Sequence, residues 1–368
     1  MARTHRIVVF GATGYTGELV SRALAARGVQ PVLAGRSQSK LEDLAADLGD
    51  LRTAVADVSR PESVRALVER GDVLISTVGP FVQWGAAAVE AAVDAGAHYV
   101  DSTGEPAFIR KVFEGYGPRA ARSGSTLLTA FGYDWVPGNL AAGMALRDAG
   151  PDAVRVDIGY FTRGGAISGG TRASSALAAL EPSFAFRSGE LRTARVGGRT
   201  RAFVIAPGKK RLAFSVGGSE HFGLPGEFPQ LREVNVMLAG AGATETRLMP
   251  LATLGLAAAR RVPPLHDGLS NLVRDRVQGS TGGPDEASRA RSSSLVIAEA
   301  FAASGELLHR TRLEGVNAYT FTGDMLAWAA TELATGSVER VGAQGPVGAF
   351  GLGRLEEGLR SAGITATA

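Results

Sequence analysis

The sequence predicts an α/β protein in which a Rossmann-type domain, a doubly wound parallel sheet, precedes a second α+β domain. From the N-terminus to Gly132 short β-type runs alternate with helical runs, which is the pattern of a parallel sheet covered by helices. After about Asp134 this alternation is replaced by longer helices and closely spaced strands. The chain of 368 residues also exceeds the size of about 250 to 300 residues at which single hydrophobic cores stop growing.

Six strands are predicted in the first domain. Each is rich in apolar or β-branched residues and is bounded by Gly, Pro or polar residues. They are Arg6–Phe10, Pro31–Gly35, Arg52–Asp57, Val73–Val78, His98–Ser102 and Thr126–Phe131. Six strands in this order suit a Rossmann domain.

Two helices between these strands carry their own boundary signals. Apolar residues from Leu41 to Leu48 recur at helical spacing, and Gly49 is expected to end that helix. Ser59 and Glu62 predict a capping box that opens a helix running to about Arg70.

The second domain is predicted to contain helices, a strand and an antiparallel meander with Gly-rich turns. A polar Gly/Ser-rich stretch within it is expected to be a loop or lid. In chain order the predicted elements are helix Gly138–Ala149, strand Ala153–Thr162, helix Thr171–Ala185, strands Arg195–Val196, Arg201–Ile205 and Arg211–Val216, loop Arg274–Ser294, strand Ser294–Gly305 and helix Val347–Ala362.

Composition excludes several classes of function. The chain has no cysteine, which rules out disulfides, thiolate metal sites, iron–sulfur clusters and a cysteine nucleophile. A formal charge of +3 is small for this length, so we expect no nucleic-acid binding. The most apolar stretch, Leu248 to Ala259, is far short of the roughly 20 residues that span a bilayer. The N-terminus passes directly into a strand and a glycine loop, so we expect no signal peptide and a cytoplasmic protein.

The strongest motif is a glycine turn between the first strand and the helix Glu18–Arg27. It reads Gly11-Ala12-Thr13-Gly14-Tyr15-Thr16-Gly17. A pyrophosphate site needs a sharp reversal, close approach of the backbone, and a helix N-terminus aimed at the anion. The spacing G-x-x-G-x-x-G departs from G-x-G-x-x-G, and the alternative is an ordinary glycine turn, but the strand and helix around it favour dinucleotide binding.

The end of the second strand predicts NADP rather than NAD. NAD sites place a carboxylate there for the ribose hydroxyls, whereas a 2′-phosphate is bound by arginine. This chain has Arg36 and Ser37, with Lys40 close behind and no acid. The alternative is that Arg36 is only a solvated residue at a strand end.

Two later strand ends are expected to complete the cofactor site, because ligands of open α/β sheets lie across the carboxyl ends of the strands. Asp57 and Val58 are placed to contact the adenine. The segment Thr77-Val78-Gly79-Pro80 is placed near the pyrophosphate and the nicotinamide ribose.

Missing motifs narrow the chemistry. No Tyr is followed four residues later by Lys, so the catalytic pair of short-chain dehydrogenases is absent. The five histidines show no i, i+4 pairing, which gives a zinc site little support. Hydride transfer without a metal remains.

These motifs resemble the saccharopine dehydrogenase superfamily, and in particular its bacterial branch that includes trans-acting enoyl reductases of lipid biosynthesis. The resemblance covers the N-terminal half and, weakly, the C-terminal helix. Many members have Phe and Ser where this chain has Tyr133 and Trp135. The matching segments are Gly11–Gly17, Ala34–Arg36, Thr77–Phe81, His98–Glu105, Phe131–Pro137 and Ser168–Thr171.

The resemblance implies a Rossmann domain, an α/β substrate domain and a last helix that returns to the Rossmann domain. It also implies reduction of an activated C=N or C=C bond by NADPH. We therefore expect an NADP-binding domain at residues 1–134, a substrate and dimerisation domain at 135–344, and a C-terminal helix within 345–368. We also expect a homodimer with a small-molecule or carrier-bound substrate.

Four residues are candidates for donating the proton that must follow the hydride. They are Asp101, Glu105, Tyr133 and Asp134, which follow the fifth and sixth strands at the open edge of the sheet. Tyr133 is the preferred donor. Asp101 is equally well explained as a helix N-cap, and Glu105 as a partner of a helix dipole.

The basic stretch Arg187–Arg211 holds eight cationic side chains against one acid, Glu190. It could steer an anionic substrate or bind an acidic acyl carrier protein. We favour a solvated sheet surface, because alternation places many of these cations on one face. For the whole chain, the alternative to a reductase is a non-catalytic NADP sensor or scaffold.

Overall fold

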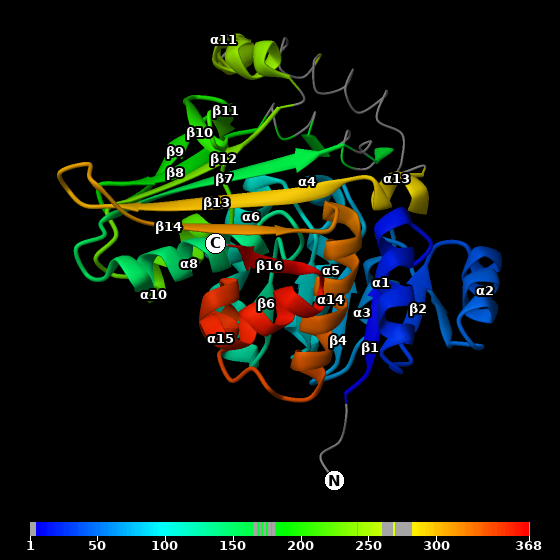
Figure 1. Cartoon of the computed structure of the whole chain (residues 1–368). Helices are drawn as coiled ribbons and strands as arrows, with labels where there is room; N and C mark the ends of the chain where they lie inside the picture. Colours follow the sequence, from blue (N-terminus) through cyan, green and yellow to red (C-terminus); the bar gives the residue numbers. More distant parts are fainter. Residues whose placement is uncertain are drawn as a thin grey trace.

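The computed structural model describes residues 5–164, 181–240, 242–259 and 282–367, together with positions 168, 169, 171, 174, 175, 178 and 268. These residues form two sheets, each with helices packed on it (Figure 1). The first sheet is parallel and the second is mixed. The predicted fold class is therefore confirmed.

The first sheet has seven strands in the order β15-β6-β5-β4-β1-β2-β3. All six predicted strands are present, slightly shorter than predicted. β1 lies between β2 and β4, so the strand order reverses beside the glycine turn, where open α/β sheets bind ligands. The strands are β1 Ile7–Phe10, β2 Val32–Gly35, β3 Thr53–Val55, β4 Val73–Ser76, β5 His98–Asp101, β6 Thr126–Leu128 and β15 Gly342–Ala343.

Alternation along the buried strands divides the core of this sheet between its two faces. On β1, Val8 belongs to one hydrophobic cluster and Val9 to the other, because successive side chains of a strand point in opposite directions. The helices of the described residues in this part are α1 Tyr15–Ala26, α2 Gln38–Asp47, α3 Pro61–Arg65, α4 Phe81–Trp84, α5 Ala86–Ala95, α6 Pro106–Arg110, a π-helical turn Lys111–Tyr116 and α7 Gly117–Ser123.

The first sheet is completed from the C-terminal half of the chain. Helix α14 (Ala318–Ala334) packs against α1 and lies over β4 and β5, and β15 pairs with β6. Figure 1 shows α14 directly beside α1. Helix α15 (Pro346–Ser361) packs mainly on α8 and α10. The domain limits at residues 134 and 344 stay a prediction. Helix α14 and strand β15 lie between these limits and yet pack on the first sheet, which argues against a simple division at residue 134.

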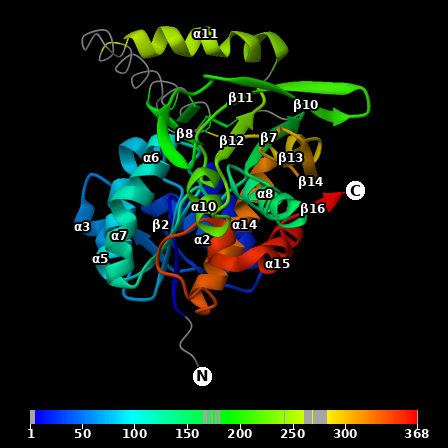
Figure 2. The ribbon, with the colours of Figure 1, turned by 90° about the vertical axis from the view of Figure 1, so that its left-hand side faces the viewer.

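The second sheet has the order β10-β11-β12-β7-β13-β14-β16, with β8 paired to β12 and β9 to β8. Helix α8 (Val136–Ala149) covers one face, while α11 (Ala243–Ala259) lies along β10 and β11 on the opposite side (Figure 2). Helices α10 (Glu220–Glu227) and α13 (Glu286–Ala290) complete this part. The strands are β7 Arg155–Arg163, β8 Ser183–Arg187, β9 Glu190–Ala194, β10 Thr200–Ala206, β11 Lys209–Ser215, β12 Glu233–Leu238, β13 Ser293–Phe301, β14 Leu307–Gly315 and β16 Ile364–Thr367.

The predicted capping box at Ser59 is wrong. The N-cap of α3 is Arg60, and no side chain caps this helix. The Ser59 hydroxyl donates instead to Asp57 Oδ1 at 2.8 Å, and the helix ends at Arg65 rather than near Arg70. A nearby carboxylate therefore competes for the serine that a capping box would use. Gly49 follows α2 with a φ of +93°, as expected for a residue that ends a helix.

Three predictions in the second domain also need correction. The strand predicted at Arg195–Val196 lies earlier, as β9, and the predicted helix Thr171–Ala185 cannot reach its end because β8 begins at Ser183. The predicted loop Arg274–Ser294 contains helix α13. Residues 274–281 of that loop and several positions of the predicted helix lie outside the described residues.

Within the described part of the chain, no helix combines the length and the apolar character that crossing a bilayer requires.

Candidate cofactor site and active site

The glycine turn has the close backbone approach that a pyrophosphate requires. A Cβ added to Gly17 would lie 2.1 Å from the carbonyl oxygen of Gly11, and one added to Gly11 would lie 2.7 Å from Thr77 Oγ1. Gly11 also has a φ of +90°, which side chains disfavour. Gly14 is the N-cap of α1 and has no side chain to bind the first amide groups of the helix. These amides therefore remain available to an anion. The turn therefore fits a dinucleotide phosphate.

The residues predicted to bind the 2′-phosphate lie together after β2. Arg36 and Lys40 are exposed, and Ser37 is the N-cap of α2 with no side-chain cap bond. Among the described residues, neither cationic side chain takes part in a hydrogen bond or an ion pair. Thr13 Oγ1 lies 3.8 Å from where a Cβ on Gly35 would be, which places the glycine turn against the same strand end.

Asp57 and Val58, which are predicted to contact the adenine, follow β3 in the same region. The Asp57 carboxylate accepts bonds from the Ser59 amide and hydroxyl, both at 2.8 Å. These bonds lower the pKa of Asp57, and the nearby charges of Arg36 and Arg60 lower it further. Val58 is partly buried against the hydrophobic cluster that contains Val8.

The segment after β4 is hydrogen-bonded to the end of β1 and to the glycine turn. Thr77 Oγ1 donates to the carbonyl oxygens of Phe10 at 3.3 Å and Gly11 at 3.2 Å. Gly79 and Pro80 follow, and Pro80 is the N-cap of α4. Val78 is half-buried against the same core as Val58. The structure thus brings all predicted cofactor residues to one edge of the first sheet.

Asp101 and Glu105, two of the predicted proton donors, are fully occupied by hydrogen bonds. Asp101 is completely buried and accepts from the amides of Thr103 at 2.8 Å and Ala130 at 2.9 Å, and from Thr129 Oγ1 at 2.7 Å. Burial raises its pKa to about 6 in spite of these bonds. Asp101 therefore holds the loops after β5 and β6 together.

Glu105 connects the two halves of the molecule. Its carboxylate accepts from the amides of Phe81 at 2.9 Å and Val82 at 2.8 Å, at the start of α4. It also accepts from Ser174 Oγ, a second-domain side chain, at 2.6 Å. Burial raises the pKa of Glu105.

Tyr133, the donor preferred from sequence, is buried with an occupied hydroxyl. Its phenol donates to the carbonyl oxygen of Phe161 at 3.1 Å, and its ring packs edge-on against Tyr160 and Phe321. Burial raises the pKa of this phenol far above its usual range, which makes it a weaker acid.

Asp134 differs from the other three candidates. Its carboxyl is half-buried, and among the described residues it has no hydrogen-bond partner. Oδ2 lies 3.1 Å from where a Cβ on Gly104 would be, so the carboxyl faces the loop that follows β5. Desolvation raises its pKa to about 6. A carboxyl of this kind can exchange a proton near neutral pH.

Sequence reasoning missed the second-domain residues that cover the glycine turn. Tyr15 donates through its hydroxyl to the carbonyl oxygen of Pro284 at 2.6 Å, and Arg289 Nη1 donates to the same hydroxyl at 3.2 Å. Tyr319 packs edge-on against Tyr15 and accepts from the amide of Ser168 at 2.7 Å. No spacing in the sequence signals these contacts, because they join segments far apart in the chain.

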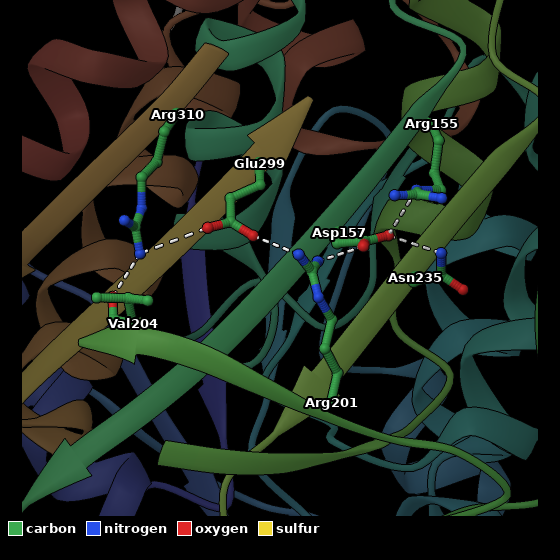
Figure 3. Close-up of polar contacts among 7 residues, drawn as sticks. All are labelled: Arg155, Asp157, Arg201, Val204, Asn235, Glu299 and Arg310. Atoms are coloured by element: carbon green, nitrogen blue, oxygen red, sulfur yellow. Dashed lines mark hydrogen bonds and ion pairs between the residues drawn. The ribbon is translucent and has the colours of Figure 1, made fainter. Parts of the chain in front are cut away.

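Part of the basic stretch is neutralised on the outer face of the second sheet. Arg201 forms ion pairs with Asp157 and, at 2.5 Å, with Glu299, both of which are buried (Figure 3). Asn235 Nδ2 donates to Asp157 at 2.7 Å, and Arg310 lies 3.4 Å from Glu299. A hollow of about 310 Å³ is lined by residues of this network, among them Asp157, Arg201 and Asn235.

Other cations of the stretch bind backbone carbonyls. Arg211 donates to Thr162 at 2.7 Å and to Gly240 at 3.2 Å, and Arg195 donates to Pro250 at 3.0 Å. These bonds give several of the basic side chains structural partners.

Comparison with known proteins agrees with this geometry. Residues 7–128 match the family model described as the saccharopine dehydrogenase NADP binding domain. Trans-acting enoyl reductases from Mycobacterium ulcerans and Mycobacterium tuberculosis are similar to part of this chain. The first is 36% identical over 156 residues, which is 41% of this chain and 37% of the relative. The second is 37% identical over 144 residues, 38% of this chain and 34% of the relative. The matches thus span less than half of the relatives' length.

The likeness of the fold extends further than that of the sequence. Apo saccharopine dehydrogenase (L-Glu forming) from Saccharomyces cerevisiae superposes with a TM-score of 0.61 at 14% identity, covering 99% of this chain and 100% of that one. The resemblance seen in the sequence and the NADP prediction are both confirmed. Residues 7–128 thus match the saccharopine dehydrogenase NADP binding domain, and the chain as a whole has the fold of saccharopine dehydrogenase.

Proposed function

We propose that the chain is an NADPH-dependent reductase of an activated C=C or C=N bond, and that Asp134 delivers the proton. The observation that carries this proposal is that the Asp134 carboxyl, at the open edge of a sheet with a glycine turn suited to NADP, has no hydrogen-bond partner among the described residues. Of the four candidate acids, Asp134 alone keeps a carboxyl without a hydrogen-bond partner among the described residues. A carboxyl that is not already bonded within the protein is available to hydrogen-bond a substrate.

The cofactor is held by residues already described. The glycine turn would hold the pyrophosphate, Arg36 with Ser37 and Lys40 would hold the 2′-phosphate, and Thr77 to Pro80 would contact the nicotinamide ribose. When bound, NADPH supplies a hydride to the electron-poor carbon of the substrate. The partner atom of the double bond then needs one proton.

Asp134 provides that proton and is left as a carboxylate. Since its pKa is about 6, a useful fraction is protonated near neutral pH, and the half-buried carboxyl recovers its proton from solvent. Tyr133 packs behind it and shapes the site without ionising. The overall change is addition of one hydride and one proton to the double bond, with NADPH oxidised to NADP⁺.

The names of the relatives favour one arm of this proposal. The M. ulcerans and M. tuberculosis proteins are named enoyl reductases, so α,β-unsaturated thioesters are the first substrates to test. Cyclic and open-chain imines form the second panel. A carrier-bound form of each unsaturated acyl group belongs in the first panel as well.

The test follows deuterium from NADPH labelled on its nicotinamide into the product. We expect transfer by the wild type, a loss of about 100-fold in kcat for Asp134→Asn, and less than about threefold for Tyr133→Phe. Equal losses in both variants would return the donor role to Tyr133. Tight NADPH binding with no deuterium transfer to either panel would favour the non-catalytic sensor.

A further inference from the structure

We propose that Glu220 is held as a neutral carboxylic acid that donates its proton to Tyr160, and that Tyr160 thereby fixes the turn carrying Asp134. Glu220 would be a positioning residue, since it touches neither substrate nor cofactor. The positioning role rests on the proposed function of Asp134, whereas the protonated state of Glu220 does not.

Glu220 is buried without any charge to compensate it. The side chain, on α10, is 0% exposed, and no Lys or Arg of the described residues forms an ion pair with it. Its Oε1 lies 2.6 Å from the Tyr160 hydroxyl, while Oε2 is buried with no hydrogen-bond partner. An ionised carboxylate in this position would lack both a counter-charge and a donor on one oxygen, which is costly. A neutral acid avoids most of that cost.

The hydrogen bonds of the Tyr160 hydroxyl point to the same state. A phenol oxygen donates one proton and accepts from donors. Here it accepts from the amide of Gly138 at 2.8 Å and lies 2.9 Å from the carbonyl oxygen of Trp135. If Glu220 were ionised, two acceptors would compete for one phenolic proton. A protonated Glu220 donates to Tyr160, and Tyr160 then donates to Trp135.

Through these bonds Tyr160 clamps the backbone next to Asp134. Trp135 is the following residue, and Gly138 lies in the first turn of α8. Asn139 Nδ2 also donates to the Trp135 carbonyl at 3.0 Å, so loss of the Tyr160 bond would loosen the turn without freeing it.

Two glycines make room for the acid. A Cβ on Gly138 would lie 2.0 Å from the Tyr160 hydroxyl oxygen and 2.6 Å from Glu220 Oε1. A Cβ on Gly218 would lie 2.3 Å from Glu220 Oε2. The pocket is therefore shaped to hold a carboxyl group of this size.

Of the titratable groups around Glu220, Asp134 favours its neutral form, while the hydrogen bond with Tyr160 lowers its pKa by less than desolvation raises it. Tyr160 of β7 and Asp134, before α8, are neutral or negative, and the adjacent His221 is kept neutral because burial lowers its pKa to about 4. Arg340 pairs with Glu227, at the other end of α10. Desolvation raises the pKa of Glu220 to about 8, and the charge of Asp134 adds to this rise.

The first test needs no substrate. At about pH 7, where carboxyls with ordinary pKa values are ionised, we expect an infrared carboxylic acid band in the wild type that is missing in Glu220→Gln. The unfolded pKa of Glu220 is 4.5 and the folded pKa about 8. The stability contributed by the protonated form is present below pH 4.5 and is lost as the pH rises toward 8. The Tm difference between Glu220→Gln and the wild type should therefore widen over this range and then level off. Absence of the band, or a constant difference in Tm, would overturn the protonated state.

The second test addresses positioning. Gln at position 220 can still donate to Tyr160, whereas Met has a similar size and cannot. We expect kcat within about twofold of the wild type for Glu220→Gln and about tenfold lower for Glu220→Met, with KM and NADPH affinity unchanged in both. A kcat for Glu220→Met equal to that of the wild type, in a folded protein, would overturn the positioning role.

The two tests separate the failure of this inference from failure of the proposed function. If the protein shows the infrared band but reduces no substrate, the neutral state of Glu220 is supported. The proposed reductase activity and the positioning role are then both rejected.

Discussion

Arg289 donates a hydrogen bond to the hydroxyl of Tyr15 at 3.2 Å, although 274 residues separate them in the chain. Tyr15 is the first residue of α1, at the helix end where the pyrophosphate is expected, and Arg289 belongs to α13 of the second domain. Ser174 forms a second bridge of this kind, to Glu105. The predicted cofactor turn is therefore held partly by residues of the second domain, and Glu105 is held by another.

Removing the hydroxyl of Tyr15 should weaken NADPH binding. In Tyr15→Phe the ring still packs on Tyr319, but the bonds to Pro284 and Arg289 are lost. At about 1 kcal/mol for such a bond, we expect a Kd for NADPH about fivefold higher, measured by fluorescence titration. Arg291→Ala is the matched control, because within the described part of the chain that side chain binds only Ser288, on the same segment. Similar losses in both variants would argue against a specific role for Tyr15.

Arg36 should decide between the two nicotinamide cofactors. Its guanidinium is exposed at the end of β2 and is free to pair with a 2′-phosphate. We expect Arg36→Ala to raise the Kd for NADPH by about 30-fold, as loss of a charge-assisted contact of about 2 kcal/mol predicts, and to leave NADH nearly unchanged. Arg60→Ala, a nearby exposed cation, serves as the control. An equal loss of both cofactors in Arg36→Ala would contradict the assignment.

The ionised Asp134 carboxylate should lower the free energy of unfolding at neutral pH. Its folded pKa of about 6 lies above the unfolded value of 3.8. Stability linked to this group is therefore present below pH 3.8 and is lost as the pH rises through 6. Asp134→Asn should be more stable at pH 7 by about 2 kcal/mol, from urea unfolding, while its turnover falls.

A control and a second readout sharpen this prediction. Asp94→Asn removes an exposed partner of Arg119 and should change stability by less than about 0.5 kcal/mol. The wild-type kcat should fall as the pH rises through about 6, and the residual kcat of Asp134→Asn should lack this step. A destabilised Asp134→Asn would mean that the carboxylate has a stabilising partner.

The first sheet could be predicted because its strands are short apolar runs with local boundaries. Val73–Ser76, for example, is entirely buried and is recognisable without knowledge of its neighbours. The two-residue strand β15 at Gly342 was beyond such reasoning, because it is too short to show a pattern and joins the sheet from the other end of the chain. The predicted capping box failed at Ser59 because the sequence does not show that Asp57 takes its hydroxyl.

The candidate site also could be predicted only where the signal is local. The cofactor residues follow from a local motif and from the rule that ligands lie at the carboxyl ends of strands. The choice of acid did not, since tertiary contacts decide which of the neighbours Tyr133 and Asp134 has its acidic group occupied by a hydrogen bond. The bond of Tyr133 to Phe161 and the pairing of Tyr160 with Glu220 are tertiary contacts without any sequence signal.

Arg201 should contribute strongly to stability, unlike most surface arginines. Its removal would leave Asp157 and Glu299, both buried, with fewer counter-charges (Figure 3). We expect Arg201→Met to lower the free energy of unfolding by about 2 kcal/mol, because Arg310 and Asn235 still bind the two carboxylates.

The control for Arg201 is Arg192→Met, since Arg192 pairs with Glu190 at 3.4 Å and both are exposed. This variant should stay within about 0.5 kcal/mol of the wild type in urea unfolding. An Arg201→Met protein as stable as this control would show that the network contributes nothing net.

Gly17 should be intolerant of any side chain. Its Cα faces the carbonyl oxygen of Gly11, and a methyl group there would lie 2.1 Å from that oxygen. In Gly17→Ala the helix α1 must move away from β1, which displaces the amide groups that face the pyrophosphate. We expect a loss of NADPH affinity of more than about tenfold together with a lower Tm, measured by titration and by thermal unfolding. Gly353→Ala, in a helix with open space at its Cα, should bind NADPH normally and be slightly more stable because alanine favours the helix. Normal NADPH binding by Gly17→Ala would mean that the phosphates do not lie on this turn.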